Sequence, residues 1–208
     1  MARERTGEGQ YVDISMLDGV ISLMHMVAMQ YFSSGRIPER GKDMLTGGVP
    51  NYNTYQTKDD KYISLGSLEP WFFQNLCKAL GREDLIPYEW DEGKRGEISS
   101  YFRDVFRTKT RDEWFKLLRQ SDICVAPVYT IDEVFTDPHV IHRRMVEEVD
   151  HPRFRKVKHV GISVKLSKTP GAIRSPAPSP GQHTDEILTE LGYAKEVIEG
   201  LKREGAIG

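Results

Sequence analysis

Hydrophobic positions repeat with two different periods along this chain, and the change of period predicts where helices and strands lie. Over 17–32 the apolar residues recur at intervals of three and four, which is typical of a helix. Residues 11–16 alternate between two faces, which predicts a strand before that helix. Alternation returns over 52–57 and 61–65 on either side of a polar turn, which predicts a β-hairpin.

Start and stop signals place the elements that follow the hairpin. Pro70 suits the first turn of a helix, and Gly81 suits the left-handed residue after its end, so a helix is expected over 70–80. Thr110 and Thr130 are each followed three residues later by a glutamate, which is the pattern of a capping box. The remaining patterns predict helices over 97–108, 110–120, 130–137, 184–191 and 195–204, and strands over 123–128, 145–149 and 161–166.

Helices and strands mix in the middle of the chain without a regular βαβ alternation, so residues 46–165 are interpreted as an α+β unit. The two ends have a different character. The strand and helix before residue 46 have no neighbouring strands with which to form a sheet. Residues 169–181 are rich in proline and glycine and are expected to form an extended linker to the last helices. The pattern therefore indicates pieces of a larger unit at both ends.

Composition excludes several classes of function. The chain has 208 residues with 29 basic and 31 acidic side chains, a balance that does not favour nucleic acid or an anionic membrane surface. Its longest apolar stretch, 20–27, is far shorter than the roughly 20 residues of a membrane span, and residues 1–5 do not resemble a secretion signal. Cys77 and Cys124 lack metal-ligand spacing and are interpreted as two buried thiols of a cytoplasmic protein. The six histidines show no metal-ligand spacing either, so no metal is expected.

One acidic residue stands out as a candidate for chemistry. Glu69 follows the second hairpin strand and lies between Leu68 and Pro70, at the start of an aromatic helix. A carboxylate in such a partly apolar place is suited to acid–base catalysis. The alternative is that the Glu69 side chain caps the free N–H groups of the helix, and spacing alone favours this second interpretation.

Several segments, taken together and in order, resemble signatures of the family III CoA-transferases, a superfamily of formyl-CoA and carnitine-CoA transferases and α-methylacyl-CoA racemases. They are Gly7–Met16, Gly47–Tyr52, Gly66–Pro70, Cys124–Val128, Asp137–His139 and Gly181–Leu188. Members of this family are about twice as long, so the resemblance identifies the chain as a C-terminal half.

The resemblance implies a division into three parts. Residues 1–45 would be the end of an α/β Rossmann-like large domain, 46–165 the small α+β domain, and 166–208 a proline linker and helices that return to the large domain. In this family two protomers interlock like links of a chain. The expected partners are therefore an N-terminal-half polypeptide, an interlocked homo- or hetero-oligomer, or both.

The resemblance also assigns a reaction. A Leu-Glu-Pro sequence at the end of this strand is similar to the racemase branch, in which a glutamate pairs with a histidine base. Epimerising carbon 2 of an acyl-CoA needs two acid–base groups on opposite sides of that carbon. Glu69 would support the histidine, while the histidine and the opposing aspartate would lie in the missing half. CoA belongs to the acyl-CoA substrate, and no cofactor is implied.

Two alternatives stay open. A CoA-transferase would use the same missing aspartate to attack the thioester and carry the acyl group covalently. Formyl-CoA-type members have a longer glycine run where this chain has only Gly47 and Gly48, which argues mildly against that subtype. The third possibility is a non-catalytic remnant or assembly subunit that keeps the small-domain fold.

The resemblance further implies a substrate surface. Its candidate residues are Met16, Met44, Leu45, Gly47, Gly48, Tyr52 and Leu68. A flexible thioether surface suits an acyl chain whose carbon 2 swings between two bases, although ordinary core packing is the alternative for each apolar residue. Met24, Met26 and Met29 have core spacing on their helix and are expected to pack in the interior.

Overall fold

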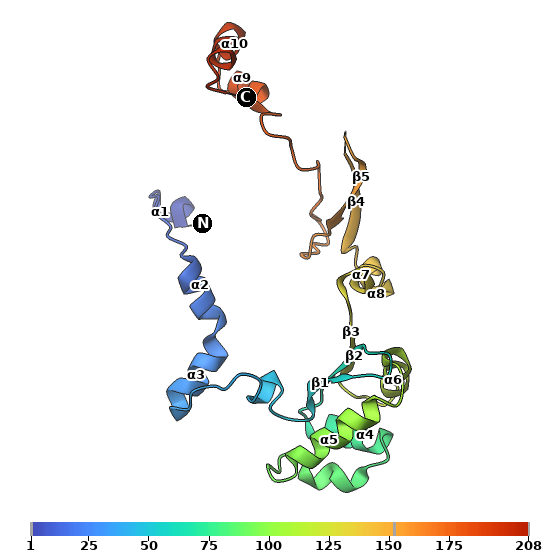
Figure 1. Ribbon diagram of the computed structural model, residues 1–208. Helices are drawn as coiled ribbons and strands as arrows, with labels where there is room; N and C mark the ends of the chain where they lie inside the picture. Colours follow the sequence, from blue (N-terminus) through green and yellow to red (C-terminus); the bar gives the residue numbers. More distant parts are fainter. Residues whose placement is uncertain (1, 152, 208) are drawn as a thin grey trace. The chain divides into compact units, whose positions relative to one another are not determined.

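A computed structural model describes residues 2–151 and 153–207, which fall into two compact units, one within Met1–Val128 and the other within Tyr129–Gly208 (Figure 1). The helices of the first unit are α1 (Ala2–Thr6), α2 (Met16–Leu23), α3 (His25–Ser34), η1 (Met44–Thr46), α4 (Pro70–Ala79), η2 (Glu83–Tyr88), α5 (Arg95–Phe106) and α6 (Arg111–Leu118), and those of the second are α7 (Ile131–Val134), α8 (Pro138–His142), α9 (Thr184–Glu190) and α10 (Lys195–Arg203). The strands are β1 (Tyr52–Gln56), β2 (Tyr62–Gly66), β3 (Val125–Val128), β4 (Val146–His151) and β5 (Arg155–Val160). These units divide the chain differently from the three predicted domains, and the domain boundaries at 45 and 165 stay predictions.

An antiparallel sheet of order β1-β2-β3 organises the first unit. Tyr55 pairs with Ile63 across the first two strands, and Ile63 pairs with Pro127 across the second and third. The hairpin predicted over 52–57 and 61–65 is confirmed. The strand expected to be buried at 123–128 is shorter and only half-buried, because alternate residues of β3 face away from the core.

The core of this unit lies between one face of the sheet and helices α4, α5 and α6. Aromatic rings dominate it. Tyr55 of β1 stacks on Phe106 of α5, with 5.2 Å between ring centroids, and Phe102 meets Tyr55 edge-on at 5.7 Å. Trp114 of α6 packs edge-on against Phe106, and its indole N–H donates to the Phe106 carbonyl. These offset and edge contacts are the arrangements that aromatic pairs prefer, so they lock the two helices to the hairpin.

The predicted helix signals of this unit are confirmed. Pro70 opens α4, and Gly81 adopts a left-handed φ of +68° just beyond its end. Thr110 and Glu113 form the capping box of α6, with the Thr110 hydroxyl accepting from the Glu113 N–H and the Glu113 carboxylate accepting from the Thr110 N–H.

The N-terminal segment differs from the sequence prediction. Residues 8–15 form no strand, and α2 begins at Met16 with Ser15 as its N-cap. An isolated strand leaves its backbone groups unpaired, and no neighbouring strand lies here within the described chain. The single helix expected over 17–32 is split, because the backbone of Met24 leaves helical geometry (ψ 4°) between α2 and α3.

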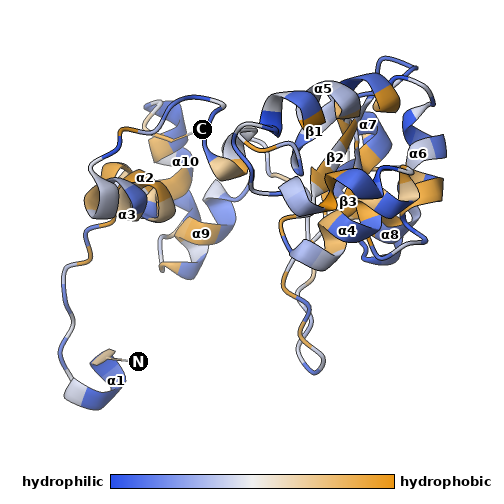
Figure 2. Cartoon of the chain, turned by 90° about the horizontal axis from the view of Figure 1, so that it is seen from below, coloured by the Kyte–Doolittle hydropathy of each residue, from blue (hydrophilic) through white to orange (hydrophobic). Residues whose placement is uncertain are grey.

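Helices α2 and α3 bury no residue in the described part of the chain. Figure 2 shows hydrophobic positions along α2. The exposed large apolar side chains of the two helices are Met16, Leu17, Val20, Ile21, Leu23, Met26, Val27, Met29, Tyr31 and Phe32. The interior packing predicted for Met24, Met26 and Met29 is therefore wrong, since each is at least 50% exposed. Among the residues that the structure describes, no helix is both long and apolar enough to cross a membrane.

In the second unit β4 and β5 form an antiparallel hairpin. The strand predicted over 161–166 lies instead at Arg155–Val160. Its basic residues face acidic residues of β4, with Glu148 opposite Lys158 and Asp150 opposite Lys156. Opposite charges across an antiparallel pair stabilise it, an effect of strand register that hydrophobic alternation does not reveal.

The C-terminal part of this unit agrees with the sequence prediction. The stretch 169–181 contains neither helix nor strand, as expected for a proline-rich linker. Helices α9 and α10 follow, joined by an ion pair of 2.7 Å between the Asp185 carboxylate and the Lys202 ammonium. Ile198 is the buried residue of α10.

Replacing Phe102 by alanine is expected to destabilise the first unit by about 3–5 kcal/mol, because it removes a fully buried ring from the aromatic cluster. Urea unfolding followed by tryptophan fluorescence measures this loss. Trp71→Ala is the matched control, because Trp71 is 55% exposed, and it should change the free energy of unfolding by much less. Equal losses in the two variants would contradict the assignment of the core.

Candidate functional site

The candidate site is built on the turn that joins β2 to α4. Gly66 ends β2 and donates its N–H to the carbonyl of Cys124 at 2.8 Å. Ser67 is fully buried, and Asn51 forms two hydrogen bonds with it. The Ser67 main-chain N–H donates to the main-chain carbonyl of Asn51 at 2.9 Å, and the side-chain amide of Asn51 donates to the main-chain carbonyl of Ser67 at 2.8 Å. This reciprocal pair fixes the backbone two residues before Glu69.

Glu69 is the N-cap residue of α4, with extended backbone angles, and its carbonyl accepts the Phe73 N–H of the first turn. Its side chain is exposed and makes no capping hydrogen bond to α4. The side-chain capping that spacing alone favoured is therefore absent from this helix. The partly apolar setting expected between Leu68 and Pro70 is also wrong, because the described chain leaves the carboxylate open to solvent.

A second carboxylate, which the sequence did not single out, lies near the first. Glu89 follows η2 and is buried, and one of its oxygens accepts a hydrogen bond of 3.2 Å from the Asn51 amide. Burial raises the pKa of Glu89, and the negative charge of Glu69 raises it further. Asn51 thus connects the turn before Glu69 to a buried acid.

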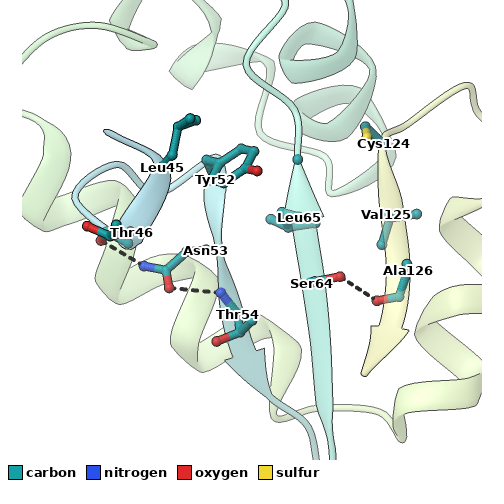
Figure 3. A pocket seen from close by; sticks show the side chains of 12 residues that line it. Leu45, Thr46, Tyr52, Asn53, Thr54, Ser64, Leu65, Cys124, Val125 and Ala126 are labelled. Atoms are coloured by element: carbon teal, nitrogen blue, oxygen red, sulfur yellow. Dashed lines mark hydrogen bonds between the residues drawn. The ribbon is translucent and has the colours of Figure 1, made fainter. Parts of the chain in front are cut away.

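A cavity of about 470 Å³ opens on the face of the sheet opposite the aromatic core (Figure 3). Its lining residues come from η1 and the glycine after it, from all three strands and from the residue before β3: Leu45, Thr46, Gly47, Tyr52, Asn53, Thr54, Ser64, Leu65, Gly66, Cys124, Val125 and Ala126. Asn53 holds its edge by donating to the Gly47 carbonyl at 3.0 Å. The Ser64 hydroxyl donates to the Ala126 carbonyl at 3.0 Å, so this face combines small polar groups with apolar surface.

A second cavity, of about 800 Å³, lies between α3 and the loop 38–46. Met44 and Leu45 line it together with Met26 of α3, and Leu45 lines the first cavity as well. The sequence did not identify Met26 as a cavity-lining residue. Its three- and four-residue spacing is the same for a helix face packed in a core and for one that lines a cavity.

The predicted substrate residues thus separate into two groups. Those that line a cavity are Met44, Leu45, Gly47 and Tyr52, and those that line neither are Met16, Gly48, Leu68 and the catalytic candidate Glu69. Met16 is 89% exposed at the start of α2. Gly48 has a backbone role, since a Cβ there would meet the Lys42 carbonyl oxygen at 2.1 Å.

The two cysteines differ, although the sequence suggested that both are buried. Cys77 is buried in α4, and burial raises the pKa of its thiol to about 12, with smaller contributions from Asp84 and Glu89. Cys124 is exposed, because it directly precedes the edge strand β3 on the open face of the sheet. Within residues 2–151 and 153–207, no group of three or more His, Cys, Asp and Glu side chains is placed to hold a metal ion.

Glu89→Gln is expected to remove a pH dependence of stability. A carboxyl whose folded pKa is raised destabilises the fold as pH rises from its ordinary pKa of 4.5 through the folded value, because the unfolded chain releases its proton first. Glutamine keeps the acceptor for Asn51 without the charge. Urea unfolding at several pH values should give a wild-type free energy that falls over this window relative to the variant. Parallel curves would contradict the buried position of Glu89.

Comparisons with known proteins agree with this fold. The profile of CoA-transferase family III matches residues 1–184. An alpha-methylacyl-CoA racemase from Homo sapiens is 34% identical, covering 99% of this chain and 53% of the racemase. A succinyl-CoA–D-citramalate CoA-transferase from Chloroflexus aurantiacus is 31% identical, covering 99% of this chain and 52% of the transferase. The crystal structure of a CAIB/BAIF family protein from Brucella suis superposes with a TM-score of 0.70 at 24% identity, covering 91% of this chain and 50% of that one.

The chain spans about half the length of the curated relatives it matches. Its similarity to a racemase and to a CoA-transferase is nearly equal, so identity alone does not separate the two reactions. The structural likeness establishes a shared fold.

Proposed function

Because this chain belongs to CoA-transferase family III, we propose that it is the C-terminal half of an acyl-CoA enzyme that epimerises carbon 2 of a 2-methylacyl-CoA. The observation that carries this proposal is the state of Glu69. Its carboxylate stands exposed at the start of α4, with no side-chain hydrogen bond or ion pair to any described residue. A carboxylate that neither caps its helix nor pairs within the fold remains free to pair with a group from outside.

Glu69 would act as the partner of a histidine base. Removing a proton from carbon 2 makes the imidazole cationic, and a carboxylate that accepts its other N–H fixes the tautomer and stabilises that charge. The histidine and the aspartate on the opposite side of carbon 2 would come from the missing half. No metal or redox cofactor enters the scheme, because CoA arrives as part of the substrate.

The cavity on the open sheet face is the proposed place for part of the substrate. Leu45, Gly47 and Tyr52 line it, and Met44 and Leu45 line the neighbouring cavity. Flexible Met and Leu side chains accommodate an acyl chain in more than one position, as reversal of configuration at carbon 2 requires. Met16, Gly48 and Leu68 would contribute only once the N-terminal half is present.

The proposed whole protein contains a second polypeptide segment. Helices α2 and α3 expose many large apolar side chains and bury none among the described residues. Apolar surface on this scale is typical of an interface. We infer that an N-terminal half covers it, in an interlocked homo- or hetero-oligomer within the cytoplasm.

A second candidate function is transfer of CoA between carboxylic acids through an aspartyl intermediate. The nearly equal similarity to a CoA-transferase favours keeping this possibility. The two reactions differ in what they need. Racemisation exchanges the hydrogen at carbon 2 with solvent and needs no acceptor acid, whereas transfer needs an acceptor acid and leaves that hydrogen in place.

The isolated chain is expected to show no exchange at carbon 2 of 2-methylacyl-CoA in deuterated water, because it brings only one of the three acid–base groups. Mixing it with a separately expressed N-terminal half from a relative should restore the exchange, measured by mass spectrometry. Activity of the isolated chain would contradict the need for a second half. A mixture that forms a complex but shows neither carbon-2 exchange nor CoA transfer to a free acid would favour the non-catalytic alternative.

In the assembled enzyme Glu69→Gln is expected to lower the rate of carbon-2 exchange by about 10²- to 10⁴-fold, because the histidine base loses the carboxylate that fixes its tautomer and stabilises its charged form. Glu83→Gln is the matched control, because Glu83 is an exposed glutamate of the same unit, and it should leave the rate unchanged. If CoA transfer to a free acid is the activity instead, Glu69→Gln should affect it much less. Equal exchange rates for wild type and Glu69→Gln would refute the role of Glu69.

A further inference from the structure

We propose that Glu89 is a positioning residue for Glu69, which acts through the Asn51 amide on the turn that carries Glu69. This role rests on the acid–base function proposed for Glu69. It extends that function to a buried residue that has no contact with the substrate cavity.

The mechanical link is a chain of hydrogen bonds through three segments. Asn51 is fully buried, and its amide nitrogen donates both to the Ser67 carbonyl at 2.8 Å and to the Glu89 carboxylate at 3.2 Å. The Ser67 main-chain N–H donates in turn to the main-chain carbonyl of Asn51 at 2.9 Å. A displacement of Glu89 is therefore transmitted to the backbone two residues before Glu69.

The side-chain amide of Asn51 acts here only as a hydrogen-bond donor. Its side-chain oxygen is buried and receives no hydrogen bond from any described residue, which is an unfavourable state for a carbonyl. Both of its N–H bonds are made, and the one to Glu89 gains strength when that carboxylate is charged. The arrangement therefore keeps the link between Ser67 and Glu89 and leaves the side-chain oxygen of Asn51 without a hydrogen bond from any described residue.

The two carboxylates are also coupled by charge. Burial raises the pKa of Glu89, and the Glu69 charge at the start of α4 raises it further. Cys77 of α4 is coupled to the same group, since the charge of Glu89 contributes to raising the pKa of the Cys77 thiol. Removing the Glu69 charge is therefore expected to lower the pKa of Glu89.

A purely structural Glu89 makes a different prediction from a positioning one. Glutamine at position 89 keeps an oxygen for the Asn51 amide and removes the charge. It should keep the turn folded but hold it less tightly, because the Asn51 side-chain amide then donates to a neutral oxygen instead of a carboxylate, while leucine at this position should disrupt the turn. If Glu89 is only structural, Glu89→Gln has no effect on any property of Glu69.

The first test is a carbon-13 NMR titration of the Glu89 side-chain carboxyl in the full chain. Glu69→Gln should lower the pKa of Glu89, because it removes a neighbouring negative charge. Glu83→Gln should leave it unchanged. An unchanged pKa in Glu69→Gln, or equal changes in both variants, would overturn the coupling.

The second test is a double-mutant cycle in the enzyme assembled with its N-terminal half. Glu89→Gln should lower kcat for carbon-2 exchange several-fold, with little change in KM, and move the acidic limb of its pH profile. In a Glu69→Gln background the same change should have no further effect. Additive losses would overturn the positioning role. Exchange of the Ser67 amide with deuterated water should be unchanged in Glu89→Gln and faster in Glu89→Leu, which separates loss of charge from loss of fold.

The two proposals fail differently. Wild-type halves that assemble without any carbon-2 exchange refute the racemase function, whatever the NMR titration shows. Exchange that depends on Glu69 but is indifferent to Glu89→Gln refutes only the positioning role.

Discussion

Two hydrogen bonds between Asn51 and Ser67 hold the turn that carries Glu69. They join the turn before β1 to the turn after β2, and both residues are fully buried. Buried backbone and amide groups without partners are costly, so this pair is difficult to break locally. Because the pair fixes the end of β2, it also fixes where α4 begins, and with it the direction in which Glu69 leaves the fold.

The aromatic core supports the same turn. Tyr55 packs against Phe102 and Phe106, and its hydroxyl donates to the Pro50 carbonyl at 2.6 Å, directly beside Asn51. The core and the polar network therefore meet at one short segment. A loss of packing in the core would loosen Asn51 first and, through Asn51, the turn that carries Glu69. The stability of this unit and the geometry of the turn are therefore coupled.

Local signals predicted the hairpin and helices α4 and α6 well, because their turn, caps and helix ends are set by residues close in sequence. Thr110 and Gly81 are examples, since each acts on its own helix end. Properties that depend on residues far apart in the sequence could not be predicted from local patterns. Glu89 lies 38 residues from Asn51, and nothing around either residue predicts their bond. The exposure of Cys124 follows from β3 being an edge strand, a matter of sheet order that the residues 123–128 do not encode.

The N-terminal helices show the opposite limit of sequence reasoning. Their apolar spacing correctly predicts helices, but spacing specifies only that a face is to be covered and not which chain covers it. In the described chain α2 and α3 cover nothing of their own, whereas the sheet with α4, α5 and α6 buries a complete aromatic core. A unit with a finished core and a segment with none differ in what they require. The first holds the turn that carries Glu69 by its own packing, whereas the apolar side chains of the second are left exposed by every residue that the structure describes.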